Sequence, residues 1–272
     1  MSRLTETGNL LQPGVNLLCF LGDYCLGHGL GVNPRRNSPL QPFQVQLSEL
    51  LMTRRILCFG DSLTWGWIAV NEGAPTTRFY YQERWTGIMA AKLGADYEIV
   101  EEGLSARTTT IDDPVDPRLN GSAYLPTALA SHLPLDLVII MLGTNDAKSY
   151  YHRTPYDTAV GMSKLVGQVL TSAGGVGTVY GAPQVLVVAP PPLAPVPDPW
   201  LQGMFEGGRE KTIELAIHYK SLADFMKVDF FDAGRAILTD GLDGIHFSAQ
   251  NNVDLGNALA DKVLEIFSRT AR

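Results

Sequence analysis

The chain has 272 residues, of which 45% are hydrophobic and 18% charged, and its formal net charge is −7. This composition is that of a globular protein, and an acidic chain without a strong basic run argues against nucleic acid or an anionic membrane surface as a partner. Three cysteines argue against a disulfide scaffold, and without a signal peptide or an apolar run of about 18 residues the chain is expected to be cytoplasmic.

Residues 1–51 differ from the rest of the chain. They are rich in Gly, Pro, Asn and Gln and show no sustained hydrophobic period. We expect an extension or leader outside the fold; the alternative is an N-terminal arm that docks on a neighbouring subunit. From Met52 onward the pattern becomes regular, and residues 52–272 are expected to form a single domain.

The expected strands are continuous apolar runs, which are typical of a parallel sheet covered on both faces. They span 54–60, 96–101, 135–142, 184–189 and 228–232. The expected helices span 83–94, 122–132, 155–172, 205–226 and 249–268. Ser248 is the expected N-cap of the last helix. This alternation predicts a three-layer α/β sandwich with its active groups at the carboxyl ends of the strands.

The sequence Gly-Asp-Ser-Leu at 60–63 follows the first strand directly. A serine in this turn, Ser62, would present its hydroxyl and its own N–H at the edge of the sheet. For an isolated motif of this kind, a serine that merely caps a helix is the favoured interpretation. Cys58, inside the strand, is expected to be a buried hydrophobic residue rather than a second nucleophile.

An aspartate and a histidine stand three residues apart, just before the last helix. Asp243 and His246 lie on one expected loop after a polar turn. A general base needs an imidazole that reaches the serine hydroxyl and a carboxylate that orients the imidazole. The pair can supply both if the loop lies opposite Ser62.

Two further residues could hold an oxyanion. Asn145, in Gly-Thr-Asn-Asp at 143–146, follows the middle strand, and Gly103 follows the second strand. The Asn145 amide and the backbone N–H groups of Gly103 and Ser62 would make three donors. The alternatives are a turn residue for Asn145 and a left-handed turn position for Gly103.

The order of these motifs resembles the SGNH (GDSL) hydrolase family over residues 53–268. The family's four named residues match Ser62, Gly103, Asn145 and His246. The surrounding sequences are most similar to bacterial aryl esterases with acyltransferase and perhydrolase activity. The resemblance implies a flavodoxin-like sandwich with a five-stranded parallel sheet. It also implies homo-oligomers, often octamers, and no metal or organic cofactor.

By the same resemblance, Ser62 attacks an ester carbonyl, His246 takes its proton, and Asp243 orients His246. The three donors hold the oxyanion, and water, an alcohol or hydrogen peroxide then attacks the acyl-enzyme. The substrate is expected to be a small short-chain or aryl ester. An acetyl esterase acting on carbohydrate uses the same triad and remains open. A non-catalytic protein of the same fold would be expected to lack one of these residues, and all are present.

The substrate pocket is expected near Leu63, Trp65 and Pro192. Trp65 and Trp67 follow the nucleophile and could line a pocket or pack in the core. The proline-rich run 189–197 follows the fourth strand, and proline stiffens the backbone. It could form an apolar wall beside the site or be an exposed connector.

Overall fold

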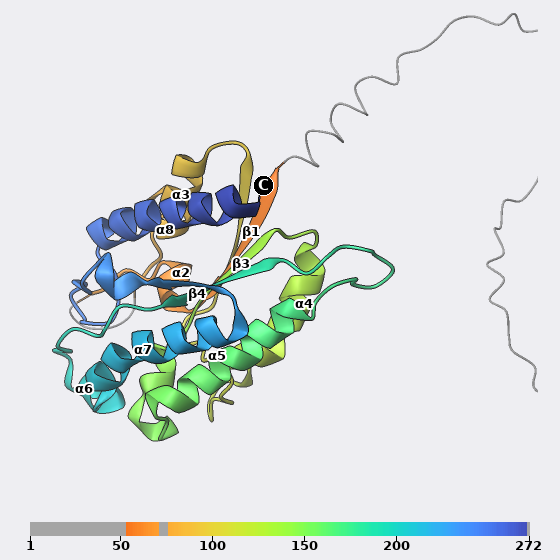
Figure 1. Ribbon diagram of the computed structural model, residues 1–272. Coiled ribbons are helices and arrows are strands. Elements are labelled where there is room, and N and C mark those ends of the chain that lie inside the picture. The colour runs from red at the N-terminus through yellow and green to blue at the C-terminus, as the bar shows by residue number, and fades with distance from the viewer. Residues whose placement is uncertain (1–52, 71–75, 271–272) are drawn as a thin grey trace, which may run out of the picture. The chain divides into compact units, whose positions relative to one another are not determined.

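The computed structural model describes residues 53–70 and 76–270 of the chain. The prediction of an extension over residues 1–51 therefore lies outside the described residues. The helices and strands alternate along the chain (Figure 1). The strands are β1 Arg54–Gly60, β2 Tyr97–Gly103, β3 Leu137–Met141, β4 Gln184–Ala189 and β5 Asp229–Asp232. The helices are α2 Ser62–Trp65, α3 Trp85–Leu93, α4 Gly121–His132, α5 Pro155–Leu170, α6 Pro199–Met204, α7 Gly208–Met226 and α8 Ala249–Thr270. Short 3₁₀ turns are η1 Tyr81–Glu83, η2 Pro117–Leu119, η3 Asn145–Ala147, η4 Ser149–Tyr151 and η5 Ala233–Arg235.

The five strands form one parallel sheet in the order β2-β1-β3-β4-β5. Helices α3 and α8 cover one face, and α4, α5 and α7 cover the other (Figure 1). β3 is buried along its whole length because it is central and covered on both sides, which is why it reads as an unbroken apolar run. The predicted three-layer sandwich with a five-stranded parallel sheet is confirmed.

The predicted elements match the observed ones with small shifts. β2 runs two residues further than expected, to Gly103, and β3 begins two residues later, at Leu137. The helix expected over 205–226 begins three residues later, as α7 at Gly208, after Gly207 with a left-handed φ of 68°, and the short helix α6 before it was not predicted. No described helix has the length and apolar character that a membrane span requires.

Helix α8 begins and packs as its sequence predicts. The Ser248 hydroxyl accepts a hydrogen bond from the Asn251 N–H at 3.1 Å, which makes it the N-cap. One apolar face is buried in the core formed with α3 and the sheet. That face carries Leu255, Leu259, Val263 and Phe267. Cys58 is also fully buried in this core, as predicted, and burial raises the pKa of its thiol.

Candidate active site

The turn after β1 holds Ser62 at the carboxyl edge of the sheet. Asp61 is the N-cap of α2, and its Oδ1 accepts a hydrogen bond from the Leu63 N–H at 2.9 Å. Ser62 is therefore the first residue of the helix and not its cap. It is 6% exposed, and its hydroxyl lies against His246. The alternative of a serine that only caps a helix does not describe this turn.

Three side chains form a continuous hydrogen-bonded series. Ser62 Oγ lies 2.9 Å from His246 Nε2, and His246 Nδ1 lies 2.6 Å from Asp243 Oδ2. The other carboxylate oxygen of Asp243 accepts the backbone N–H groups of Ile245 and His246, both at 2.9 Å. Burial alone would raise the pKa of Asp243, but the hydrogen bonds and the charge of His246 outweigh it and lower the pKa. Such a series can carry a proton from a hydroxyl to an imidazole.

The loop that carries this pair is fixed from two sides. Gly244 has a left-handed φ of 74°, and a Cβ there would lie 2.3 Å from the Pro195 carbonyl oxygen. The Gly244 carbonyl also accepts the Ala194 N–H at 2.9 Å. On the other side, the Trp67 ring stacks on His246 with the ring centres 5.2 Å apart. The imidazole is thus held by packing as well as by Asp243.

Donors for an oxyanion lie beside Ser62. Within the described part of the chain, the backbone N–H groups of Ser62 and Ala106 have no acceptor. Ala106 adopts a left-handed φ of 67°. The Asn145 amide donates to Asp61 Oδ2 at 3.2 Å and to the Arg107 carbonyl at 3.1 Å. Asn145 is therefore in place, but both of its amide hydrogens already have protein acceptors.

Gly103 does not lie where the sequence predicted. It ends β2, paired with Gly60, and it does not line the cavity that contains Ser62. A Cβ at this position would lie 2.4 Å from the Trp65 backbone nitrogen. Glycine is needed here because α2 packs directly on the end of β2. Its assignment as an oxyanion donor is wrong in this structure, and Ala106 occupies the expected place.

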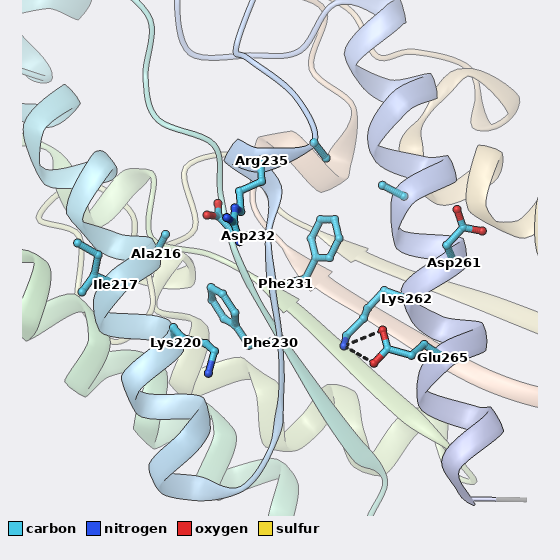
Figure 2. Close-up of a pocket in the computed structure, with 12 residues that line it drawn as sticks. Ala216, Ile217, Lys220, Phe230, Phe231, Asp232, Arg235, Asp261, Lys262 and Glu265 are labelled. Atoms are coloured by element: carbon cyan, nitrogen blue, oxygen red, sulfur yellow. Dashed lines mark hydrogen bonds and ion pairs between the residues drawn. The ribbon is translucent and has the colours of Figure 1, made fainter.

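The cavity at Ser62 has a volume of about 230 Å³. Its lining residues come from the strand ends, the turns and α6: Ser62, Trp67, Ser105, Ala106, Asn145, Lys148, Leu201, Met204, Phe205, Asp243, Ile245 and His246. A larger hollow of about 830 Å³ lies beside β5, where Phe230 and Phe231 stand between α7 and α8 (Figure 2). Its lining contains no serine, cysteine or histidine. The smaller cavity is therefore the candidate active site.

Comparison with known families agrees with this geometry. Residues 58–251 match the model of the GDSL-like lipase/acylhydrolase family. The chain belongs to this family, the SGNH hydrolases. It is a carboxylic ester hydrolase, since its similar solved structures are aryl and acetyl esterases. No curated protein matches the chain.

Three solved structures show the likeness within the SGNH hydrolases. An aryl esterase from M. smegmatis is 69% identical with a TM-score of 0.78, over 78% of this chain and 99% of that one. A carbohydrate acetylesterase from Sinorhizobium meliloti is 71% identical with a TM-score of 0.78, over 79% and 100%. A carbohydrate acetylesterase family member from the same organism is 36% identical with a TM-score of 0.72, over 78% and 97%.

The three residues predicted to line the pocket of this SGNH hydrolase all lie elsewhere. Leu63 is buried in the core under α3 and α8. The Arg78 guanidinium lies over the Trp65 ring, with its Cζ 5.2 Å from the centre of that ring. Pro192 packs beside Gly234, and its carbonyl accepts the Thr239 hydroxyl. The prediction failed because a side chain's direction depends on how each turn leaves the sheet.

Other residues take their place. Of the two tryptophans, Trp67 lines the cavity. The proline-rich run packs against the loop of Asp243, while the next segment, α6, supplies the apolar wall. Lys148, three residues after Asn145, also lines the cavity and was missed. Its closeness to Asn145 was a signal in the sequence, whereas nothing in the sequence indicated the left-handed φ of Ala106.

Proposed function

We propose that this SGNH esterase hydrolyses short-chain or aryl esters through an acyl-enzyme on Ser62. The observation that carries the proposal is the series Ser62–His246–Asp243, with distances of 2.9 and 2.6 Å, at a cavity of about 230 Å³. A cavity of this size suits a small acyl group. The 69% identity to an aryl esterase supports the same substrate class.

In the first step, Ser62 Oγ attacks the ester carbonyl and passes its proton to His246 Nε2. Asp243 stabilises the imidazolium that forms. The negative charge that develops on the carbonyl oxygen is held by the backbone N–H groups of Ser62 and Ala106. The Asn145 amide joins them by exchanging its contact with the Arg107 carbonyl for the substrate oxygen.

In the second half of the reaction, His246 protonates the leaving alcohol or phenol, which departs as the carbonyl re-forms. Water then gives a proton to His246 and attacks the acyl-enzyme, and His246 returns the proton to Ser62 Oγ as the acid is released.

We also propose that an alcohol or hydrogen peroxide can replace water in the second half, giving a new ester or a peracid. The apolar wall of Leu201, Met204, Phe205 and Ile245 supports this, because it offers water few hydrogen-bond partners. The test measures how the acyl-enzyme partitions between water and added methanol, from the amounts of acid and methyl ester that form. A partition that follows only the bulk concentrations and intrinsic nucleophilicities of water and methanol would contradict the acyl-transfer proposal.

A second candidate is removal of acetyl groups from carbohydrate. The 71% identity to a carbohydrate acetylesterase favours it. The reaction at Ser62 is the same, but a sugar needs a more open and polar entrance. The two candidates are separated by comparing kcat/KM for an acetylated oligosaccharide with that for phenyl acetate.

The main proposal is tested by hydrolysis of p-nitrophenyl acetate by the wild type and by Ser62→Ala, with a long-chain ester beside it. We expect the wild type to prefer acetate and Ser62→Ala to lose at least about 10³-fold in kcat. Undiminished turnover in Ser62→Ala would contradict the mechanism. A preference for the long chain would leave the mechanism standing and contradict the small acyl site.

A further inference from the structure

One buried cation at the cavity has no hydrogen-bond or ion-pair partner among the residues that the structure describes. Lys148 is 5% exposed and lines the cavity that contains Ser62. Among the described residues it is the one buried lysine, and its ammonium makes no hydrogen bond or ion pair. Other lysines of the described chain pair at the surface, such as Lys92 with Asp261 at 2.6 Å and Lys220 with Asp224 at 2.6 Å.

The carboxylates around Lys148 are occupied by other donors. Asp146 accepts the backbone N–H and the hydroxyl of Thr109, and Asp61 accepts Leu63 and Asn145. Asp113 accepts the backbone N–H groups of residues 115 and 116 and the Tyr151 hydroxyl. These groups favour the charged lysine at a distance but leave its three N–H donors unpaired.

Two backbone contacts keep the lysine at the cavity. Its own N–H donates to the Asn145 carbonyl at 3.2 Å, and its carbonyl accepts the Tyr151 N–H at 3.2 Å. The next residue, Ser149, donates from its hydroxyl to the Gly203 carbonyl of α6 at 3.0 Å. Lys148 thus belongs to the same rigid turn as Asn145, with α6 packed beside it.

Burial weakens the hydration of the Lys148 ammonium, which costs free energy, and it accordingly lowers the pKa of Lys148. A ligand that brings an anion into the cavity recovers that cost, since a charged acceptor forms a stronger hydrogen bond than a neutral one. The other ionisable groups of the lining, Asp243 and His246, are hydrogen-bonded to each other. Lys148 is left as the group that can recognise charge on a substrate.

We propose that Lys148 makes the site selective for small esters that carry a carboxylate. The carboxylate can belong to the acyl part, as in a half-ester of a dicarboxylic acid, or to the alcohol part, as in an ester of a hydroxy acid. The inference rests on the proposed function, because it assigns a substrate class to the site of Ser62.

Two matched pairs of esters distinguish these sources. In the acyl arm, monomethyl succinate is compared with methyl levulinate, which replaces the carboxylate by a methyl ketone. In the alcohol arm, O-acetylglycolate is compared with acetoxyacetone. For each pair the ratio of kcat/KM, charged over neutral, is measured in the wild type, Lys148→Met and Lys148→Arg. Lys164→Met, at an exposed position on α5, is the control.

We expect the ratio to fall at least about tenfold in Lys148→Met in one arm, which identifies the part of the ester that carries the charge. Lys148→Arg should keep the ratio within about threefold, because it retains the cation, and Lys164→Met should keep it unchanged. An unchanged ratio in Lys148→Met in both arms would overturn the proposal.

If Lys148→Met does not fold, the proposal is tested by the preference of the wild type for charged over neutral esters. After division by the rates of alkaline hydrolysis, one charged ester should still be favoured at least about tenfold over its neutral partner. No preference in either arm would overturn the proposal. Ser62→Ala is assayed with all four esters. Activity that survives in it contradicts the proposed function, whereas a dead Ser62→Ala with an unchanged ratio contradicts the assignment of Lys148 alone.

Discussion

The Asn145 amide nitrogen lies 3.2 Å from Oδ2 of Asp61, the residue just before the nucleophile. The other oxygen of the same carboxylate holds the first turn of α2 through the Leu63 N–H. One buried side chain thus joins the turn that carries Ser62 to the amide expected to hold the oxyanion. Asp61 is 1% exposed, and burial raises its pKa to about 6, against the opposing effect of its hydrogen bond from Leu63.

Replacing Asp61 with asparagine should reduce kcat by about 10- to 100-fold with a smaller change in KM. The new amide can still accept from Leu63, but it then places a second NH₂ group against the Asn145 amide, which must turn away. Steady-state kinetics of Asp61→Asn, Asn145→Ala and the double variant measure the coupling. If Asp61 acts through Asn145, Asp61→Asn should cost little in the Asn145→Ala background. Equal losses in both backgrounds would refute this role.

The same carboxyl group should give the stability of the protein a defined pH dependence. Below about pH 4, Asp61 is protonated in the folded and unfolded states. As the pH rises to about 6, the unfolded chain ionises first, and the folded state loses stability relative to it. A rise in pKa from 3.8 to about 6 corresponds to about 3 kcal/mol.

Urea unfolding of the wild type and Asp61→Asn between pH 4 and pH 7 measures this effect. The fixed cost of the substitution cancels when the pH values are compared. The free energy of unfolding of Asp61→Asn, relative to the wild type, should rise by about 2–3 kcal/mol over this range and level off near pH 7. A difference that is constant with pH would show that the pKa of Asp61 is not raised by burial.

Substitutions at Gly244 and Gly207 test how tightly the loop that carries His246 is packed. Both have a left-handed φ, of 74° and 68°, but only Gly244 is crowded, by the Pro195 carbonyl. Gly244→Ala should therefore destabilise the fold by about 2–4 kcal/mol and lower kcat by displacing His246. Gly207→Ala should cost about 1 kcal/mol and leave kcat unchanged, because nothing lies near its Cβ. Thermal unfolding and kinetics of both variants test the pair, and equal behaviour would contradict the crowding.

Phe205 should limit the length of the acyl group, because it is buried and lines the cavity. Shortening it to alanine opens space beyond the apolar wall. We expect the ratio of kcat/KM for p-nitrophenyl hexanoate over acetate to rise at least about tenfold in Phe205→Ala. Pro192→Ala is the control, since Pro192 does not line the cavity. If this ratio rose in Pro192→Ala and not in Phe205→Ala, the proline-rich run would form the apolar wall, as predicted from the sequence, and Phe205 would not.

The hydrophobic patterns of the sequence predicted the strands and helices, but they did not predict the directions in which individual side chains and backbone groups point. The apolar run of β3 and the periodic face of α8 located the sheet and the last helix to within two residues. The motifs of Ser62 and Asn145 were predicted at strand ends and that of Asp243–His246 just before the last helix, and the structure brings them together. Gly103 was predicted to hold the oxyanion because a glycine after the second strand offers an unobstructed backbone N–H. Only the packing of Trp65 on it shows that the close approach of α2 is the reason for a glycine here.

The residues that line the pocket could not be predicted from the sequence, because they depend on how the backbone turns between them. Trp65 and Trp67 are two residues apart, yet Gly66 between them takes a left-handed φ of 91° and turns only the second ring toward His246. Lys148 was missed because no sequence pattern shows that its ammonium has no hydrogen-bond or ion-pair partner among the described residues. Its burial became visible only when the turn after Asn145 was seen packed beside α6.

The acyl-enzyme itself is the most direct test of the account. The protein is mixed with p-nitrophenyl acetate, quenched in acid at short times, and examined by intact mass and peptide mapping. The wild type should gain the mass of one acetyl group, mapped to Ser62, and His246→Ala should lose this adduct. Turnover with acetyl on another residue, or turnover in Ser62→Ala at the wild-type rate, would contradict the mechanism.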